Sequence, residues 1–276
     1  MTAPSFDEIL KLDQVGEDLF EGSTPPGAFA AAGPAIFGGQ LVAQALLAAG
    51  QTAPDKIRHS LHAYYARPGD VAQPVTYEVV RVRDGRSFST RQVTARQRGA
   101  VVLLFMASFK HPEPGPTHQG EMPKAPSPDD PQIDTGRPFW DVPTIQGVPM
   151  ELGRVVPAAL PAPPGHPPVQ RFWFRAKAPI AGGEAMQAAA LAYISDIALL
   201  ATSMLPHGDV FAAGRGVSSS LDHSLWFHRP TDVGEWHLFD QHSPAADDAR
   251  GLALGSIWRA DGTLVATAAQ EGLMRS

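Results

Sequence analysis

One carboxylate in this sequence is conspicuous because of its surroundings. Asp196 lies in MQAAALAYISDIALLATSML, residues 186–205, a stretch whose other residues are uncharged and which we predict to be one apolar helix. A buried, unpaired carboxylate is costly, so such a residue needs a reason. Burial raises the pKa of a carboxyl group, which would let Asp196 accept a proton from water near neutral pH. The alternatives are a structural arginine partner or a place on the helix's solvent face.

The second half of the chain repeats the first. FGGQLVAQALLAAG at 37–50 predicts a helix that a glycine pair opens, and 186–205 predicts its counterpart. Alternating apolar residues predict antiparallel strands after each helix, with turns at 83–85 and 98–99 in the first half. The predicted strands are 59–68, 75–85, 87–96 and 101–109, then 169–177, 217–229, 235–242, 250–259 and 263–274.

Three short matches support a duplication because they occur in the same order. SDIALLA at 195–201 resembles AQALLAA at 43–49, HSL at 223–225 repeats HSL at 59–61, and the turns at 261–262 and 98–99 are each followed by apolar residues. Two long helices, each ahead of a twisted antiparallel sheet, predict an α+β fold in which a sheet wraps around its helix.

The remaining segments connect or precede these halves. Residues 1–20 predict a short amphipathic helix with Phe6, Ile9 and Val15 on one stripe. More than half of the 27 prolines fall within 111–168, a density that helices and central strands do not tolerate. We expect domains at 1–110 and 154–276 joined by a proline-rich linker, 111–153, that crosses a surface and contains at most one short strand.

Composition excludes several functions. There are no cysteines, so disulfides, thiolate metal sites and cysteine nucleophiles are excluded. The net charge of −6 disfavours nucleic acid as a partner. The ten histidines form no H-E-x-x-H spacing, and no G-x-S-x-G, G-x-G-x-x-G or Walker motif occurs, so we expect no metal and no nucleotide cofactor. We also expect no membrane span, no signal peptide and a cytoplasmic location.

Six motifs resemble the acyl-CoA thioesterase II family of double hot-dog proteins. They cover most of the chain outside the linker and occur in the family's order. The matching segments are FGGQLVAQAL (37–46), HSLHAYYARPGD (59–70), RDGRSFSTRQV (83–93), LAYISD (191–196), SSLDHSLWFHRP (219–230) and AAQEGLMR (268–275). The resemblance implies hydrolysis of fatty acyl-CoA to free acid and CoA by activated water, without metal or covalent intermediate. CoA would be part of the substrate, and no separate cofactor is expected.

The resemblance also implies catalytic residues. Its Asp falls on Asp196, its hydroxyl residue on Ser220 and its Gln on Gln270, and together they would hold the water. Many relatives have Thr where this chain has Ser220, and a serine rotates more freely than a β-branched threonine. Relatives form dimers or tetramers, so a homodimer or homotetramer is expected.

Aligning the two halves by their shared letters predicts one site per chain. The alignment places Gln44 opposite Asp196, Lys56 opposite Ser220 and Ala107 opposite Gln270, so the first half lacks the set. It could still assist, because the backbone N–H groups at Gly38 and Gly39 open a helix and could polarise a thioester carbonyl. Simple packing of this helix start is the alternative.

Three arginines are candidates for binding a substrate phosphate. Arg67, Arg91 and Arg229 could pair with CoA phosphates or be ordinary surface charges. The histidines of the strands, His59, His62, His223 and His228, are interpreted as structural. Two other functions remain open: a non-catalytic acyl-CoA or lipid-binding double hot-dog protein, and an enoyl-CoA hydratase-like hot-dog enzyme. The second usually pairs an Asp with a His, and no such pair is predicted beside Asp196.

Overall fold

The computed structural model of the chain describes residues 3–29, 34–130, 133, 147–156, 165–207 and 216–275, and these form two repeats of one plan. Each repeat has a strand pair, a buried helix and four antiparallel strands. In the first they are β1 (Leu12–Gly16), β2 (Leu19–Gly22), α2 (Gly38–Gln51), β3 (Ile57–Tyr65), β4 (Val75–Asp84), β5 (Phe88–Gln97) and β6 (Ala100–Lys110). In the second they are β7 (Met150–Val156), β8 (Val169–Ala176), α3 (Gly183–Ser195), β10 (Asp222–Phe227), β11 (His237–Asp247), β12 (Arg250–Arg259) and β13 (Leu264–Arg275).

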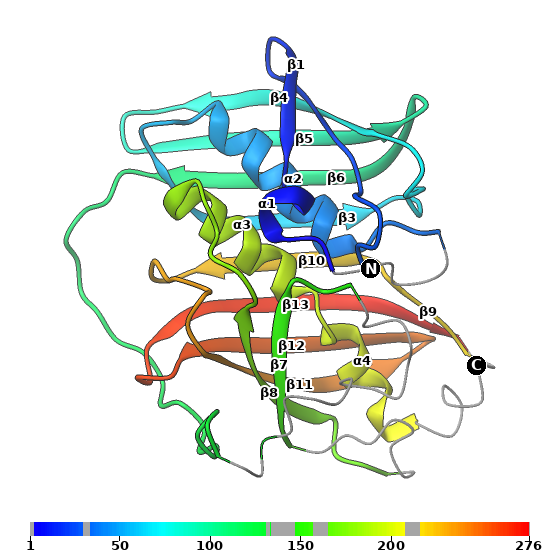
Figure 1. Cartoon of the computed structure of the whole chain (residues 1–276), viewed down its shortest axis with the longest axis vertical. Coiled ribbons are helices and arrows are strands. Elements are labelled where there is room, and N and C mark those ends of the chain that lie inside the picture. Colours follow the sequence, from blue (N-terminus) through cyan, green and yellow to red (C-terminus); the bar gives the residue numbers. More distant parts are fainter. Residues whose placement is uncertain are drawn as a thin grey trace.

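The strands of both repeats join in one sheet whose order is mirrored about its centre. Within the described residues the order is β1-β2-β4-β5-β6-β3-β10-β13-β12-β11-β8-β7, with the short β9 (Val217–Ser220) added to β13. The centre is the antiparallel β3–β10 pair, in which Leu61 lies opposite Leu225. In Figure 1 the N-terminal strands fill the upper half and the C-terminal strands the lower half. The expected α+β double hot-dog fold is confirmed.

The two long helices lie in the core against the same face of the sheet (Figure 1). Strand burial alternates at the start of β4, where Val75, Tyr77 and Val79 are buried and the residues between them are not, because successive side chains point to opposite faces. In α2 and the second half of α3 nearly every residue is buried, which explains their almost uniformly apolar composition. By length and composition alone the stretch Gly183–His207 could span a membrane, but 78% of its apolar part is buried inside the molecule, as in the core helix of a folded domain.

Two expected helices differ from the structure. Residues 1–20 do not form one helix: after α1 (Phe6–Ile9) the chain turns into β1 and β2, which extend the sheet beside β4. The helix expected at 186–205 is interrupted after Ser195 and resumes as α4 (Leu199–Met204), followed by a 3₁₀ turn (Leu205–His207). Ala198 causes the interruption by adopting a left-handed conformation, φ 65°.

The described part of the linker crosses the surface of the molecule. Residues 111–126 form no helix or strand, and Pro126 accepts a hydrogen bond from the Trp173 indole at 2.9 Å. Met122 packs with Trp173 on a small outer cluster of the second repeat. The expected boundary between the linker and the second domain, at residues 153 and 154, falls inside strand β7. Residues 131–132, 134–146 and 157–164 lie outside the described residues.

Candidate active site

Asp196 follows directly after α3, where the start of α2 meets the end of that helix. Asp196 is buried, with 7% of its surface exposed. Glycines make this meeting possible: a Cβ atom on Gly38 would lie 2.9 Å from Oδ2 of Asp196, and one on Gly39 would lie 2.4 Å from the carbonyl oxygen of Tyr193. The glycine pair therefore brings the N-terminus of a first-repeat helix against a second-repeat carboxylate.

The carboxylate is held by two donors. The Gln270 side-chain amide, from β13, donates to Oδ1, and the backbone N–H of Gly39 also donates to Asp196. Burial raises the pKa of Asp196 to about 7, although both hydrogen bonds lower it. No described cation pairs with this carboxylate, and its neighbour His223 is neutral, since burial lowers the pKa of that histidine to about 3. Asp196 can thus gain and lose a proton near neutral pH.

A cavity of about 770 Å³ opens beside this carboxylate. It is large enough for a drug-sized ligand. Its wall includes Asp196, Gln270 and Ser220, the three residues predicted to hold a water, together with Gly38. Ser220 reaches the cavity from the end of β9, where it pairs with Gly272. Gly39 does not line the cavity, and its N–H is directed at Asp196.

Two buried polar atoms at the cavity have no hydrogen-bond partner within the described residues. They are the Oε1 of Gln270 and the hydroxyl of Tyr65, and both residues line the cavity beside Asp196. Buried polar groups are almost always satisfied, so an unpartnered pair suggests a polar occupant such as water or substrate oxygen. The remaining walls are largely apolar, with Phe29, Ile36, Phe37, Leu41, Ile197, Leu199, Leu200 and Met204.

Sequence reasoning missed one residue of this site. No histidine was expected beside Asp196, but Nδ1 of His223 lies 3.9 Å from its Oδ1 and 3.3 Å from Nε2 of Gln270. The expectation is wrong because sequence adjacency suggests only Asp222 as a partner for His223, and the Asp222 side chain instead accepts a hydrogen bond from the Glu271 N–H. The usable signal was that β10 and β13 were both predicted strands and could pair side by side.

The alignment of the halves also needs correction. Gln44 lies in the middle of α2, where it binds the Ile9 carbonyl and the Tyr77 hydroxyl, whereas Asp196 follows the end of α3. The residue that follows α2 is Thr52. In the paired strands Ala107 corresponds to Ala268, which makes Phe109 the counterpart of Gln270. The first repeat still has neither the carboxylate nor the amide.

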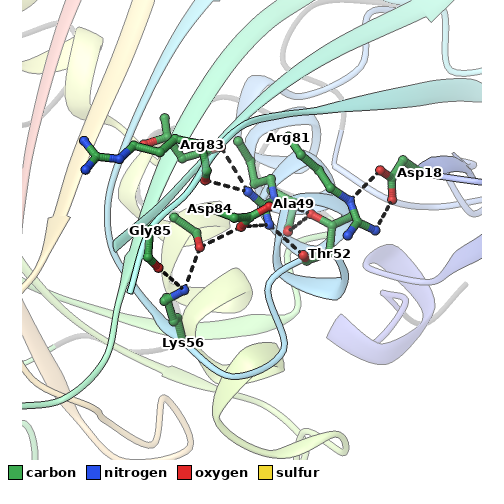
Figure 2. A network of polar contacts seen from close by, with 11 residues as sticks. Asp18, Ala49, Thr52, Lys56, Arg81, Arg83, Asp84 and Gly85 are labelled. Atoms are coloured by element: carbon green, nitrogen blue, oxygen red, sulfur yellow. Dashed lines mark hydrogen bonds and ion pairs between the residues drawn. The ribbon is translucent and has the colours of Figure 1, made fainter. Parts of the chain in front are cut away.

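The three candidate arginines occupy different places. Arg67 lines the cavity and is the candidate that remains for a CoA phosphate. Arg91 is buried, 1% exposed, and its guanidinium binds Asp84 and Thr52, so it cannot reach a substrate. Figure 2 shows the polar network around Asp84 and Thr52. Arg229 lines a separate cavity of about 50 Å³ and donates to the Leu264 carbonyl.

The fold and this cavity define a class of protein: a double hot-dog chain with one buried carboxylate at the junction of its two helices. The acyl-CoA thioesterase N-terminal domain model matches residues 25–110, and the acyl-CoA thioesterase C-terminal domain model matches residues 120–274. The chain belongs to the acyl-CoA thioesterase family.

Individual proteins are similar in sequence over nearly the whole length of this chain. The chain is 39% identical to human acyl-coenzyme A thioesterase 8, covering 97% of this chain and 88% of that protein. It is 37% identical to acyl-CoA thioesterase 2 of Haemophilus influenzae, covering 97% and 96%. The solved structure of the acyl-CoA thioesterase II TesB2 from Mycobacterium marinum superposes with a TM-score of 0.81 at 36% identity, covering 98% and 96%.

Proposed function

We propose that this chain hydrolyses acyl-CoA thioesters to a free acid and CoA, with water as the nucleophile and Asp196 as the base. One observation carries this mechanism: a buried carboxylate whose pKa is raised to about 7 lies at the cavity wall, next to an unpartnered buried amide oxygen. The named activity of the relatives supports the reaction, and the cavity supports an acyl substrate.

The mechanism uses four groups. One hydrogen of the water is accepted by Asp196 and the other by Oε1 of Gln270, while the hydroxyl of Ser220 holds the water in line with the carbonyl carbon. As the water oxygen bonds to that carbon, its proton passes to Asp196. The N–H of Gly38, a helix-start donor without an intrahelical partner, stabilises the oxyanion. Collapse breaks the C–S bond, and the CoA sulfur takes the proton from Asp196.

No metal, separate cofactor or covalent intermediate enters this scheme. Within the described ranges no three His, Asp or Glu side chains are grouped as metal ligands would be. The apolar walls suit an acyl tail, and Arg67 suits a phosphate of CoA.

The two other candidate functions are less well supported by the site. For a hydratase, a histidine must reach the substrate, but His223 is fully buried and does not line the cavity. A non-catalytic binding protein would not need a carboxylate with a raised pKa at the cavity wall.

The decisive experiment is a thiol-release assay over acyl-CoA substrates from short to long acyl chains. Wild type should release CoA, with kcat/KM rising as Asp196 ionises through about pH 7. Asp196→Asn should abolish release. Asp222→Asn is the matched control, because the Asp222 carboxylate is half-buried and does not line the cavity. This substitution should leave kcat nearly unchanged. Full activity in Asp196→Asn would contradict the mechanism, and hydration of enoyl-CoA without thiol release would favour the hydratase.

A homodimer or homotetramer belongs to the same proposal. Four apolar side chains are exposed on neighbouring strands of the outer sheet face: Tyr64 (66%), Leu104 (45%), Met106 (43%) and Trp226 (38%). Such a patch is typical of a surface that another subunit covers. Light scattering of wild type and of the double variant Leu104→Glu/Met106→Glu tests it, with dissociation expected in the variant.

A further inference from the structure

We propose that His223 and Ser195 are positioning residues that fix which way the Gln270 amide points, so that its nitrogen faces Asp196 and its oxygen faces the cavity. The proposal rests on the function proposed above, in which that oxygen and Asp196 share one water. It comes from a chain of hydrogen bonds that runs from α3 through β10 to β13 and returns to the residue after α3.

The first link determines which ring nitrogen of His223 carries hydrogen. The hydroxyl of Ser195 donates to the carbonyl oxygen of Ala192 at 2.8 Å, so its only hydrogen is used. The same hydroxyl oxygen lies 2.8 Å from Nε2 of His223 and must therefore accept from it. Nε2 is thus the protonated nitrogen of the ring.

The second link follows from the neutrality of the ring. His223 is fully buried, and burial lowers its pKa to about 3, so a neutral ring with hydrogen on Nε2 has a bare Nδ1. Nε2 of Gln270 lies 3.3 Å from that Nδ1. The amide group therefore meets two acceptors, Nδ1 of His223 and Oδ1 of Asp196, and donates one hydrogen to each.

The reversed amide would be unfavourable at both contacts. When Asp196 is ionised, the amide oxygen would face a carboxylate oxygen and an imidazole lone pair, with no donor to replace the two lost hydrogen bonds. With the amide held in place, Oε1 is left buried and unpartnered at the cavity, where it can accept the second hydrogen of the water. The amide N–H also lowers the pKa of Asp196, so the same orientation keeps more of the base ionised.

The first repeat shows that this arrangement is not required by the fold. His59 occupies the position that corresponds to His223, but its Nε2 binds Ser108 at 2.8 Å on the partly exposed side of the strand. Phe109 stands where the second repeat has Gln270. This chain of hydrogen bonds from Ser195 through His223 and Gln270 to Asp196, called the relay below, therefore occurs in the repeat that has the catalytic carboxylate.

The test compares His223→Asn with His223→Leu, two side chains of similar size. Asparagine can place an acceptor oxygen near the position of Nδ1, and leucine cannot. We expect His223→Leu to lower kcat roughly tenfold to a hundredfold with KM changed by less than about threefold, because the acyl-CoA contacts are retained. His223→Asn should stay within about threefold of wild type.

The pH profile supplies a readout that a purely structural role would not move. If the amide turns away in His223→Leu, Asp196 loses a donor, so the acid limb of kcat/KM should shift to higher pH. The other titratable groups that face the carboxylate are Tyr65 and Tyr193, and burial raises the pKa of both above the assay range. Ser195→Ala removes the acceptor for Nε2 and should shift the limb in the same direction by less.

Thermal unfolding of each variant separates misfolding from mispositioning, and Ser195→Ala provides the test if His223→Leu does not fold. The proposal is supported if the acid limb of kcat/KM moves to higher pH in His223→Leu and returns to its wild-type position in His223→Asn. Wild-type kcat in His223→Leu, or an equal loss in the leucine and asparagine variants with an unmoved limb, overturns it. Inactivity of Asp196→Asn together with full activity of His223→Leu would leave the proposed hydrolysis intact and reject only the relay.

Discussion

Burying the ionised carboxylate of Asp196 lowers the stability of the folded chain, although the proposed mechanism requires that ionised form. Its carboxyl has a pKa of about 7 in the folded chain, against 3.8 for an ordinary Asp. Between these values the folded state holds the proton and the unfolded state does not, so stability falls as pH rises from about 4 to about 7. Each pKa unit corresponds to about 1.4 kcal/mol, so ionised Asp196 is a substantial cost to folding.

Asp196→Asn should therefore stabilise the protein while it abolishes hydrolysis. Asparagine keeps an acceptor oxygen for the Gln270 amide but carries no charge to bury. We expect a higher Tm than wild type at pH 8 and a much smaller difference at pH 4.5, measured by thermal unfolding at both values. Asp222→Asn, which changes a half-buried carboxylate, serves as control and should give a smaller gap. Equal gains at both pH values for Asp196→Asn would contradict the burial argument.

Ser220 tests how tightly the water must be held. Ser220 lines the cavity, and its hydroxyl makes no hydrogen bond to another described side chain. Ser220→Ala should lower kcat roughly tenfold, the cost of one hydrogen bond to the water. Ser220→Thr should equal or exceed wild type, because β-branching restricts χ1 and holds the hydroxyl. Steady-state kinetics with one acyl-CoA decides, with Ser218→Ala at the same cavity as control; an unchanged kcat in Ser220→Ala would remove this serine from the mechanism.

At the scale of elements, the site depends on the close contact between the start of α2 and the end of α3. Gly39→Ala should destabilise the chain by about 1–3 kcal/mol, because the new methyl would lie 2.4 Å from the Tyr193 backbone oxygen, which cannot move aside easily. Gly50→Ala in the same helix is the matched control: its nearest neighbour would be Phe109 at 3.8 Å, and it should be neutral or slightly stabilising. Denaturant unfolding measures both, and equal effects would show that the junction tolerates side chains.

The elements also show what the sequence could and could not predict. The limits of α2 were predictable to within a residue because a glycine pair marks its start and its apolar run marks its length. Strands β1 and β2 were not, since β2 pairs with β4, far along the chain, and β1 pairs only with β2 among the described strands. The interruption at Ala198 carries no glycine or proline signal. Asp196 and Gln270 were found by motif, but His223 depends on partners in two other elements.

On the scale of the whole molecule, two repeats share one sheet but differ at their mirrored helix junctions. One junction opens into the cavity of about 770 Å³ beside Asp196. The other, at the start of α3, holds an ion pair between Arg58 and Glu184 beside a cavity of about 50 Å³. In the proposed mechanism the first repeat supplies the helix start at Gly38, and the second repeat supplies the base, Asp196. Neither repeat alone contains the complete site.

This division predicts that the two repeats stay together and stay active when the chain is cut between them. They share the β3–β10 ladder from Ser60–Trp226 to Tyr64–Asp222, and α2 packs along α3, so the linker is not what holds them. Gly115 is a suitable place to insert a protease site, because residues 111–121 are exposed and a side chain there would meet nothing within 4 Å. After cleavage, gel filtration should show one particle and thiol release should remain within about twofold of the uncut protein. Wild type treated with the same protease is the control. Separation of the fragments, or loss of activity without separation, would show that the covalent connection itself maintains the junction at Asp196.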